Sequence, residues 1–194
     1  MKVIVGITGA SGSVYAVKLL RTLKALGVEV TVICSEMGIK VMEYECGISG
    51  KEIFHDYDAY ENSDLFAPVA SGSNKWDAMI IVPCSINTLG AIANGIGNSL
   101  LLRVASVTLK ENRKLITVVR ETPLSFINLR NMCTLSQAGC CIMPASPGFY
   151  GKPRKIDDLI DSLVARMLDE LGIENSMGNR WKGDENETGR QGIV

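Results

Sequence analysis

The chain has 194 residues, of which 46% are apolar and 21% charged, and its net charge is −1. This length predicts one domain with a sizeable core over residues 1–181, followed by a polar, disordered tail over 182–194. A charge this close to zero gives no reason to expect nucleic acid or an anionic membrane as a partner. No apolar run reaches the roughly 20 residues that span a bilayer, and no cleavable leader is recognisable, so a cytoplasmic protein is expected.

Cysteine and histidine usage argues against several kinds of active site. Six cysteines form no C-x-x-C pair and most lie in apolar runs, which predicts buried thiols in a reducing compartment and no metal site. The single histidine, His55, lies in a polar stretch that is expected to be a surface loop. A Ser-His-Asp hydrolase or a histidine proton relay would have to use this one residue, and a solvated side chain is the favoured interpretation.

The first apolar run, over residues 2–7, breaks into glycines and small hydroxyls before a helical pattern begins over 13–26. Gly9 and Gly12 allow a tight turn, and Ser11 is expected to cap the helix. The positive end of the helix macrodipole makes this turn a candidate phosphate cradle. However, the glycine spacing matches neither G-x-G-x-x-G nor the P-loop, so a plain connection remains equally open.

A second strand over 28–34 ends at Ser35, where a dinucleotide-binding enzyme usually offers an acid to a ribose hydroxyl. Glu36 follows and fits the first turn of a helix over 36–46, which is its favoured interpretation. Glu45 lies near the end of this helix, where a carboxylate is poorly placed with respect to the dipole. This placement hints at another role, although a solvated acid is the default.

A long polar section reaches to about residue 75, and a buried strand follows over 76–84, with Trp76 expected in the core. The next turn is rich in hydroxyls and leads into a helix over 85–97. The side chains of this turn can cap that helix or hold a polar ligand; they are Ser85, Asn87 and Thr88.

A helix over 99–110 and a strand over 114–119 lead to Arg120 and Glu121, and Pro123 is expected to start another helix. Two adjacent opposite charges at the end of a buried strand are hard to explain by packing, although a satisfied salt bridge is the alternative. The last predicted elements are a strand over 140–145 and an amphipathic helix over 155–171.

Alternating strands and helices predict an α/β fold with a parallel sheet and helices on both faces. Ligands bind such sheets outside the carboxyl ends of the strands. Residues 9–12, 35, 85–88 and 120–121 all fall at carboxyl ends, so they are expected to converge on one site.

Several segments of the sequence resemble the UbiX family of flavin prenyltransferases, which also includes one of the subunits of hydroxyarylic acid decarboxylases. In chain order they are GITGASG, ASGS, PCSINTL, LKENRKL, VRETPLS, PGFY and RW. The resemblance implies a flavodoxin-like (Rossmann-like) three-layer fold and a homododecamer built from trimers. It also implies transfer of a dimethylallyl group from dimethylallyl phosphate to N5 and C6 of reduced FMN, without a metal. The prenylated FMN would be delivered to a UbiD-type decarboxylase.

The resemblance also implies roles for individual residues. The implied FMN contacts are Gly9, Ala10, Ser11, Ser35, Ser85, Ile86, Asn87, Thr88 and Arg120. The implied contacts with dimethylallyl phosphate, some of them from a neighbouring protomer, are Arg103, Lys110, Tyr150, Arg166 and Trp181. The residues implied in proton handling are Ser11, Glu45 and Glu121.

Two other functions stay open at this point. A peptidyl-cysteine decarboxylase shares the FMN cradle, but such enzymes rely on a catalytic histidine after the helix that follows the second strand, and none is present there. A non-catalytic flavin-binding accessory subunit of a phenolic acid decarboxylase would show the same cradle.

Overall fold

A six-stranded sheet forms the middle of the molecule, with the strand order β3-β2-β1-β4-β5-β6. The computed structural model describes residues 1–178, so the predicted Trp181 contact and the predicted tail lie outside the described residues. All neighbouring strands pair in parallel. The strands are β1 (Lys2–Ile7), β2 (Glu29–Cys34), β3 (Asp58–Glu61), β4 (Ala78–Cys84), β5 (Lys114–Val119) and β6 (Cys141–Pro144). The order reverses between β1 and β4, where ligands of such sheets bind.

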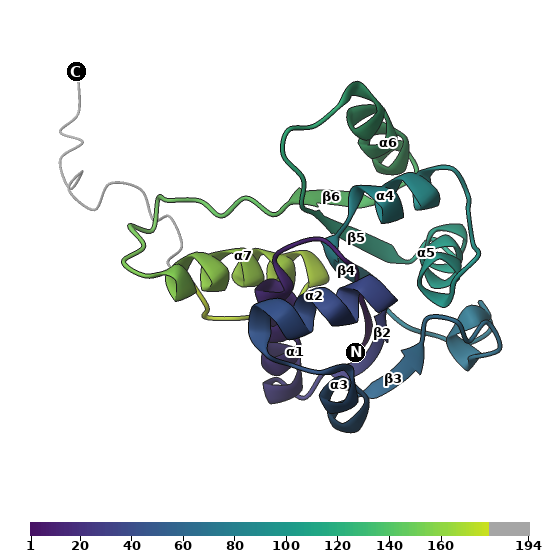
Figure 1. Cartoon of the computed structure of the whole chain (residues 1–194), viewed down its shortest axis with the longest axis horizontal. Helices are drawn as coiled ribbons and strands as arrows, with labels where there is room; N and C mark the ends of the chain where they lie inside the picture. Colours follow the sequence, from purple (N-terminus) through teal and green to yellow (C-terminus); the bar gives the residue numbers. More distant parts are fainter. Residues whose placement is uncertain (179–194) are drawn as a thin grey trace, which may run out of the picture.

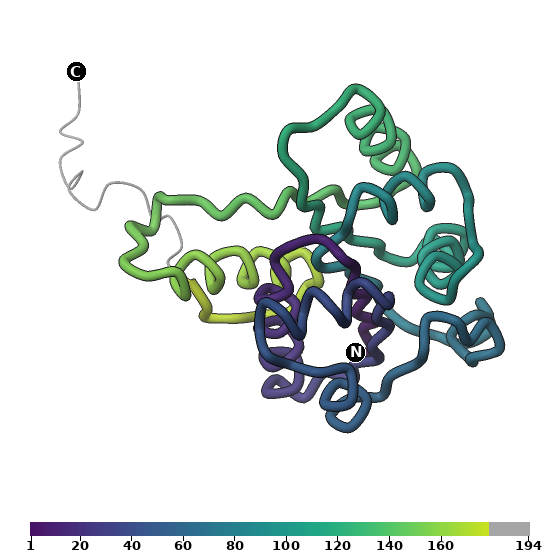
Figure 2. The backbone as a smooth tube through the Cα atoms, viewed as in Figure 1, coloured from purple at the N-terminus to yellow at the C-terminus, as the bar shows by residue number. Residues whose placement is uncertain are grey.

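Helices cover both faces of the sheet (Figures 1 and 2). They are α1 (Ser13–Ala25), α2 (Glu36–Cys46), α3 (Gly50–Asp56), the 3-10 turn η1 (Pro68–Ala70), α4 (Ile86–Ala93), α5 (Leu100–Lys110), α6 (Phe126–Gln137) and α7 (Ile156–Leu171). Side chains of α1, α2, α3 and α7 share one core cluster, whereas those of α4, α5 and α6 share the other. The predicted α/β fold with three layers is confirmed. Within residues 1–178, no helix combines the length and apolar character needed to cross a bilayer.

The alternation of side chains along β1 explains why its sequence is apolar throughout. Val3, Val5 and Ile7 enter the cluster under α1 and α7, whereas Ile4 enters the cluster under α4 and α5. Successive side chains of a strand point to opposite faces, and a central parallel strand has both faces covered. All four of these side chains are fully buried as a result.

The polar section before residue 75 is more structured than predicted. It contains α3 and β3, and His55 therefore lies on α3 instead of in a loop, although its side chain is 88% exposed. Ser49 and Glu52 form a capping box at the start of α3. Elements this short carry too little periodicity for the pattern of apolar residues to show them.

Two predicted boundaries are also wrong. Strand β4 begins at Ala78 instead of residue 76, although Trp76 is buried in the core as expected. Helix α6 begins at Phe126 and not at Pro123, because Ser125 caps the helix by accepting a hydrogen bond from the backbone N–H of Asn128.

All six cysteines are free, and their burial differs more than predicted. Cys34, Cys84 and Cys140 are buried, and burial raises the pKa of Cys34 to about 12 and that of Cys140 to about 11. Cys133, in contrast, is exposed on α6, because that helix turns few of its side chains toward the core. The remaining two cysteines, Cys46 and Cys141, are half-buried.

Candidate functional site

The loop after β1 turns into α1 through Gly12, whose φ of 106° lies in the left-handed region that favours glycine. Gly12 occupies the N-cap position, so it offers no side chain to the helix. The carboxylate of Glu45, on α2, takes that role, and its Oε2 accepts from the backbone N–H groups of Gly12 at 2.9 Å and Ser13 at 2.8 Å. The prediction that Ser11 caps α1 is therefore wrong, because the cap falls one residue later.

Glu45 is thus a helix cap and not merely a solvated acid. Partial burial alone would raise the pKa of this carboxyl group. Hydrogen bonds from the Ser11 hydroxyl and from the N–H groups of Gly12 and Ser13 outweigh burial and lower the pKa below its ordinary value. The ionised carboxylate is therefore the form that stabilises the start of α1.

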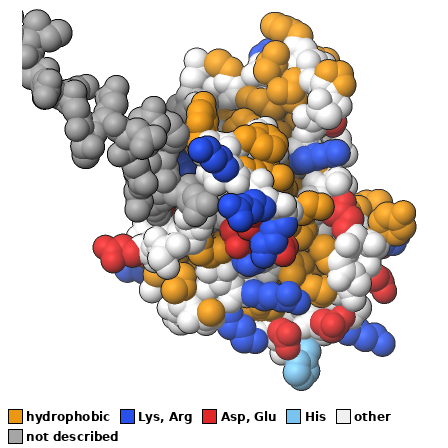
Figure 3. Space-filling view, turned by 90° about the vertical axis from the view of Figure 1, so that its left-hand side faces the viewer, with side chains coloured by type: hydrophobic (Ala, Val, Ile, Leu, Met, Phe, Trp, Pro, Cys, Tyr) orange, Lys and Arg blue, Asp and Glu red, His pale blue; other side chains and the backbone are white. Residues whose placement is uncertain are grey.

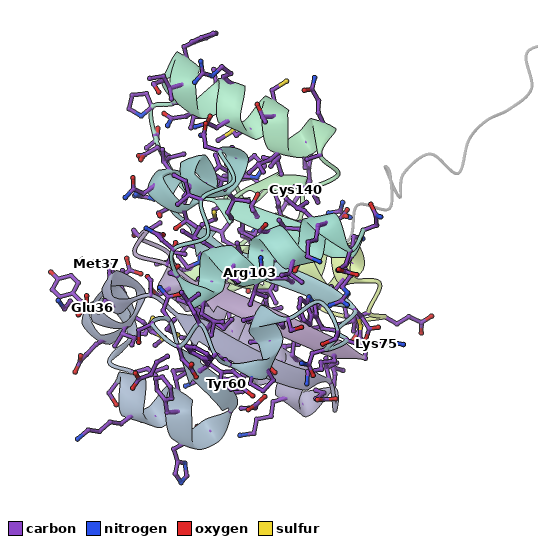
Figure 4. All side chains as sticks on the ribbon, turned by 90° about the vertical axis from the view of Figure 1, so that its right-hand side faces the viewer. Glu36, Met37, Tyr60, Lys75, Arg103 and Cys140 are labelled. Atoms are coloured by element: carbon purple, nitrogen blue, oxygen red, sulfur yellow. The ribbon has the colours of Figure 1, made fainter. Side chains whose placement is uncertain are left out.

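The first turn of α2 lies directly against the loop that follows β1. A Cβ at Gly9 would lie 2.6 Å from the Cβ of Met37, and one at Gly38 would lie 2.6 Å from the carbonyl oxygen of Ile7. Both glycines are therefore required by close approach and not by backbone conformation. Ser35 caps α2 by accepting from the Gly38 N–H at 3.0 Å, and Glu36 lies in the first turn of α2, as favoured from the sequence (Figure 4).

The turn after β4 is tied to the first loop by Thr8, which the sequence analysis missed. The buried Thr8 hydroxyl donates to the Pro83 carbonyl at 2.7 Å and accepts from the Ser85 N–H at 2.8 Å. Ser85 in turn caps α4 by accepting from the Thr88 N–H at 3.3 Å. The sequence did offer a signal for Thr8, because its hydroxyl follows directly after an apolar run. A buried hydroxyl needs hydrogen-bond partners, so this residue could have been expected to tie two segments together.

Arg120 and Glu121 lie at the same edge of the sheet, just beyond β5. The backbone N–H of Arg120 donates to the Cys84 carbonyl at 3.2 Å, which places this residue beside the β4–α4 turn. The Glu121 carboxylate accepts from the Thr122 N–H at 2.9 Å. Within residues 1–178 neither side chain forms an ion pair, and both are exposed. Among residues 1–178, the structure therefore gives the salt-bridge explanation for this pair no partner.

These elements bring three helix N-termini, several hydroxyls and one guanidinium to the carboxyl edge of the sheet. Such a donor set suits a ligand with an anionic phosphate and a polar ring. The predicted convergence of residues 9–12, 35, 85–88 and 120–121 at this edge agrees with the strand order.

Tyr150 and Arg166 lie elsewhere in the chain. After β6 the chain runs out from the sheet and returns as α7 alongside α1 (Figure 1). Both residues line a groove of about 680 Å³ between this arm and α7. The Arg166 guanidinium pairs with Asp169 at 3.1 Å and keeps 64% of its side chain exposed.

Arg103 and Lys110 lie on α5. Arg103 donates from Nε to the Ala70 carbonyl at 3.1 Å and lines a second groove, of about 480 Å³. Lys110 forms an ion pair with Glu111 at the end of the helix.

The sheet separates these two groups of residues. Helix α7 belongs to the core cluster on one face, and α5 belongs to the cluster on the other face. Within one chain, Arg103 and Arg166 therefore line two separate grooves.

Comparison with known proteins places this geometry in a family. The Flavoprotein family model matches residues 1–168. Flavin prenyltransferase UbiX from Methanocaldococcus jannaschii is 50% identical over 182 residues, which cover 93% of this chain and 98% of that relative. The chain belongs to the UbiX family of flavin prenyltransferases. The resemblance inferred from the sequence motifs is thereby confirmed.

Two solved UbiX-type structures extend the match to three dimensions. AnUbiX (PadA1) in complex with FMN and dimethylallyl pyrophosphate has a TM-score of 0.91 and 42% identity, and the match covers 94% of this chain and 97% of that one. A dodecameric FMN-dependent UbiX-like decarboxylase from Escherichia coli O157:H7 has a TM-score of 0.92 and 40% identity, covering 94% and 100% of the two chains. The UbiX fold predicted for this chain is confirmed.

Proposed function

We propose that this protein is a flavin prenyltransferase that moves a dimethylallyl group from dimethylallyl phosphate to N5 and C6 of reduced FMN. The observation that carries the proposal is the donor-rich carboxyl edge in a chain 42% identical to a protein solved with FMN and dimethylallyl pyrophosphate. A non-catalytic accessory subunit is not favoured, because relatives that are 50% and 46% identical to this chain are named flavin prenyltransferases.

The residues at the carboxyl edge fit FMN. Two backbone segments, Gly9–Ser11 and Ser85–Thr88, lie at or before helix N-termini. The N–H groups of Gly12 and Ser13 are taken by Glu45, so the phosphate donors are the remaining N–H groups of these segments, together with Ser35 and Arg120. When bound, reduced FMN supplies the nucleophilic flavin atoms that accept the prenyl group.

Departure of phosphate from the prenyl donor requires fixed positive charge. Arg103, Lys110 and Arg166 supply that charge, and the Tyr150 hydroxyl adds a donor. Preorganised charge of this kind is typically the largest catalytic contribution. An aromatic side chain can shield the positive charge that develops on the allylic carbon. Trp76 is buried in the core, so Trp181, which lies outside the described residues, is the proposed aromatic residue.

The donor site has to be assembled from several copies of the chain, because Arg103 and Arg166 lie on opposite faces of the sheet. We therefore propose a homododecamer, in line with the dodecameric relative.

The surface proposed for contact between copies is poor in charge. Residues 122–151 contain a single charged residue, Arg130, and hydrophobic side chains gather over α6 at the upper end of Figure 3. Depletion of charge and exposed aromatic residues are typical of interface cores. The large exposed apolar side chains of this segment are Leu124, Phe126, Ile127, Leu129, Phe149 and Tyr150.

Ring closure on the flavin releases a proton that the protein has to accept. Glu121 is our first choice for the base, because it is exposed at the carboxyl edge and His55 lies on α3. Ser11 and Glu45, which are hydrogen-bonded to each other, complete the proposed proton-handling group. The released phosphate is the alternative acceptor.

We propose that one domain, residues 1–181, performs this reaction in the cytoplasm, where free thiols such as these persist. The prenylated FMN then passes to a UbiD-type decarboxylase.

The proposal is tested by mixing the purified protein with reduced FMN and dimethylallyl phosphate under anaerobic conditions. Mass spectrometry is expected to show a flavin product heavier by one C5 unit, formed over many turnovers. A protein that binds FMN but yields only unmodified flavin would be an accessory subunit instead. Dimethylallyl pyrophosphate, tested in parallel, identifies the donor.

A further inference from the structure

Two residues proposed to contact FMN are held to β1 through their backbone N–H groups. The Ser35 N–H donates to the Ile7 carbonyl at 2.9 Å, so its partner is a main-chain group. The Ser85 N–H donates instead to a side chain, the Thr8 hydroxyl, at 2.8 Å. The position of Ser85 therefore depends on a group that a substitution can remove.

Thr8 lies where the backbone hydrogen bonds between β1 and β4 cannot continue. The pairing of these two strands extends to Gly6, which lies opposite Ile81. Pro83, further along β4, carries no N–H group that could donate to β1. The Thr8 hydroxyl donates to the Pro83 carbonyl at 2.7 Å and so replaces the missing link between the strands.

The hydroxyl of Thr8 is used entirely within the protein. Thr8 is 1% exposed, its oxygen accepts from the Ser85 N–H, and its proton goes to the Pro83 carbonyl, which can only accept. A buried group with both partners in place is costly to disturb, because each partner would lose its hydrogen bond. Thr8 therefore holds the end of β1 and the turn after β4 at a fixed separation.

This link lies at the point where the strand order reverses. Strands β1 and β4 are neighbours in the middle of the sheet, and ligands of such sheets bind in the crevice at this point. The segment Gly9–Ser11 follows Thr8 directly, and Ser85–Thr88 follows the end of β4. One hydroxyl thus sets the separation of the two backbone segments proposed to hold FMN.

The influence of Thr8 extends beyond the Ser85 N–H. The Ser85 hydroxyl accepts from the Thr88 N–H at 3.3 Å and lies 3.0 Å from the Thr88 hydroxyl, so it caps the start of α4. The carbonyl of Cys84, in the same turn, accepts from the Arg120 N–H at 3.2 Å. A shift of this turn would therefore move the N-terminus of α4 and Arg120 together.

We propose that Thr8 is a positioning residue for FMN, whose hydroxyl sets the width of the crevice between β1 and β4 in which the flavin nucleotide binds. Thr8 is not itself a ligand, because its side chain is buried and its proton is given to Pro83. The inference rests on the proposed function, since it concerns the same flavin site. It makes FMN affinity depend on a hydroxyl that does not touch the flavin.

The test measures the Kd of oxidised FMN by fluorescence titration of the assembled protein. Thr8→Val keeps the shape of the side chain but removes the hydroxyl, which leaves the Ser85 N–H and the Pro83 carbonyl without this partner. The Kd is expected to rise by about 10-fold, as for the loss of one buried hydrogen bond. Thr8→Ser keeps the hydroxyl and is expected to bind FMN as the wild type does.

Thr31→Val is the matched control for a loss of stability alone. Thr31 is fully buried in the first half of β2, and its hydroxyl donates to the Asp58 carboxylate at 2.8 Å. The same substitution there removes a hydrogen bond of similar length away from the carboxyl edge. Denaturant titrations are expected to show both valine variants destabilised, with FMN affinity reduced only in Thr8→Val.

A second measurement needs no variant. In the flavin-free wild-type protein, hydrogen exchange read at single amides by mass spectrometry is expected to show a protected Ser85 N–H, and rapid exchange of this amide would overturn the inference. A wild-type Kd in Thr8→Val, or an equally weakened Kd in Thr8→Ser or Thr31→Val, would overturn it as well. These results leave the proposed function intact, which wild-type protein that binds no FMN would contradict.

Discussion

The carboxylate of Glu45 joins two elements whose contacting residues lie 33 positions apart in the chain. It accepts from the backbone N–H groups of the N-cap and the first residue of α1, which have no partner within the helix, and it also accepts a hydrogen bond from Ser11 in the proposed FMN loop. The ionisation of one side chain therefore affects the stability of the fold and the shape of the site together.

Glu45→Gln is expected to lower the free energy of unfolding by about 1 kcal/mol, because the start of α1 loses a charged acceptor. The pKa of Glu45 is lowered in the folded state, so its contribution is present above its ordinary value of 4.5 and is lost as the pH falls through the folded pKa. Denaturant titrations at neutral and acid pH measure both effects. Glu43→Gln, on the same helix, is the control, and equal stability of the two variants at neutral pH would refute the cap.

Glu121→Gln is expected to retain FMN binding and to form prenylated FMN about 100-fold to 10,000-fold more slowly, because the proposed base is removed. Flavin titration and single-turnover product analysis measure the two properties separately. Glu36→Gln removes a similar charge from the same edge of the sheet and should leave the rate unchanged. A Glu121→Gln variant with the wild-type rate would assign the proton to the released phosphate.

At the scale of elements, the loop after β1 and the first turn of α2 behave as one unit. Gly9 accommodates the Cβ of Met37, and Gly38 accommodates the carbonyl oxygen of Ile7, so neither segment can move without the other. The unit fixes Ser11 and Ser35, two of the residues proposed to contact the flavin nucleotide, relative to each other.

Gly9→Ala is expected to destabilise the protein by about 1 to 3 kcal/mol, because the added methyl group overpacks the contact with Met37. The same shift should weaken FMN binding. Thermal denaturation and flavin titration measure these effects. Gly97→Ala is the control, because the nearest atom to its added Cβ would be 4.0 Å away. A Gly9→Ala variant with wild-type stability would show that the contact between Gly9 and Met37 does not hold α2 in place.

The length and regularity of each element explain whether its position could be predicted from the sequence. Strand β5 and helix α7 are long and regular, so their patterns of apolar residues gave their positions within one residue. Short α3 and β3 lack such a pattern, and the capping of α1 by Glu45 depends on tertiary contact between distant segments. Motif resemblance supplied the proposed site residues, but no sequence rule showed that Arg103 and Arg166 would lie on helices on opposite faces of the sheet.

At the scale of the whole molecule, the two arginines proposed to bind the prenyl donor lie on helices on opposite faces of the sheet. The proposed FMN contacts gather at the carboxyl edge, whereas Arg103 lies on α5 in one helical layer and Arg166 lies on α7 in the other. If both arginines bind one donor molecule, as proposed, a second copy of the chain has to supply one of them. The charge-poor segment 122–151 offers the surface on which copies can meet.

The most direct test of this shared site is complementation between protomers. Arg103→Ala and Arg166→Ala are each expected to form prenylated FMN far more slowly than wild type. When the two variants are unfolded together and reassembled in equal amounts, about one site in four receives both arginines from different copies, and activity should recover accordingly. Reassembled mixtures that bind FMN and reach the wild-type oligomeric state but show no recovery would contradict a donor site shared between protomers.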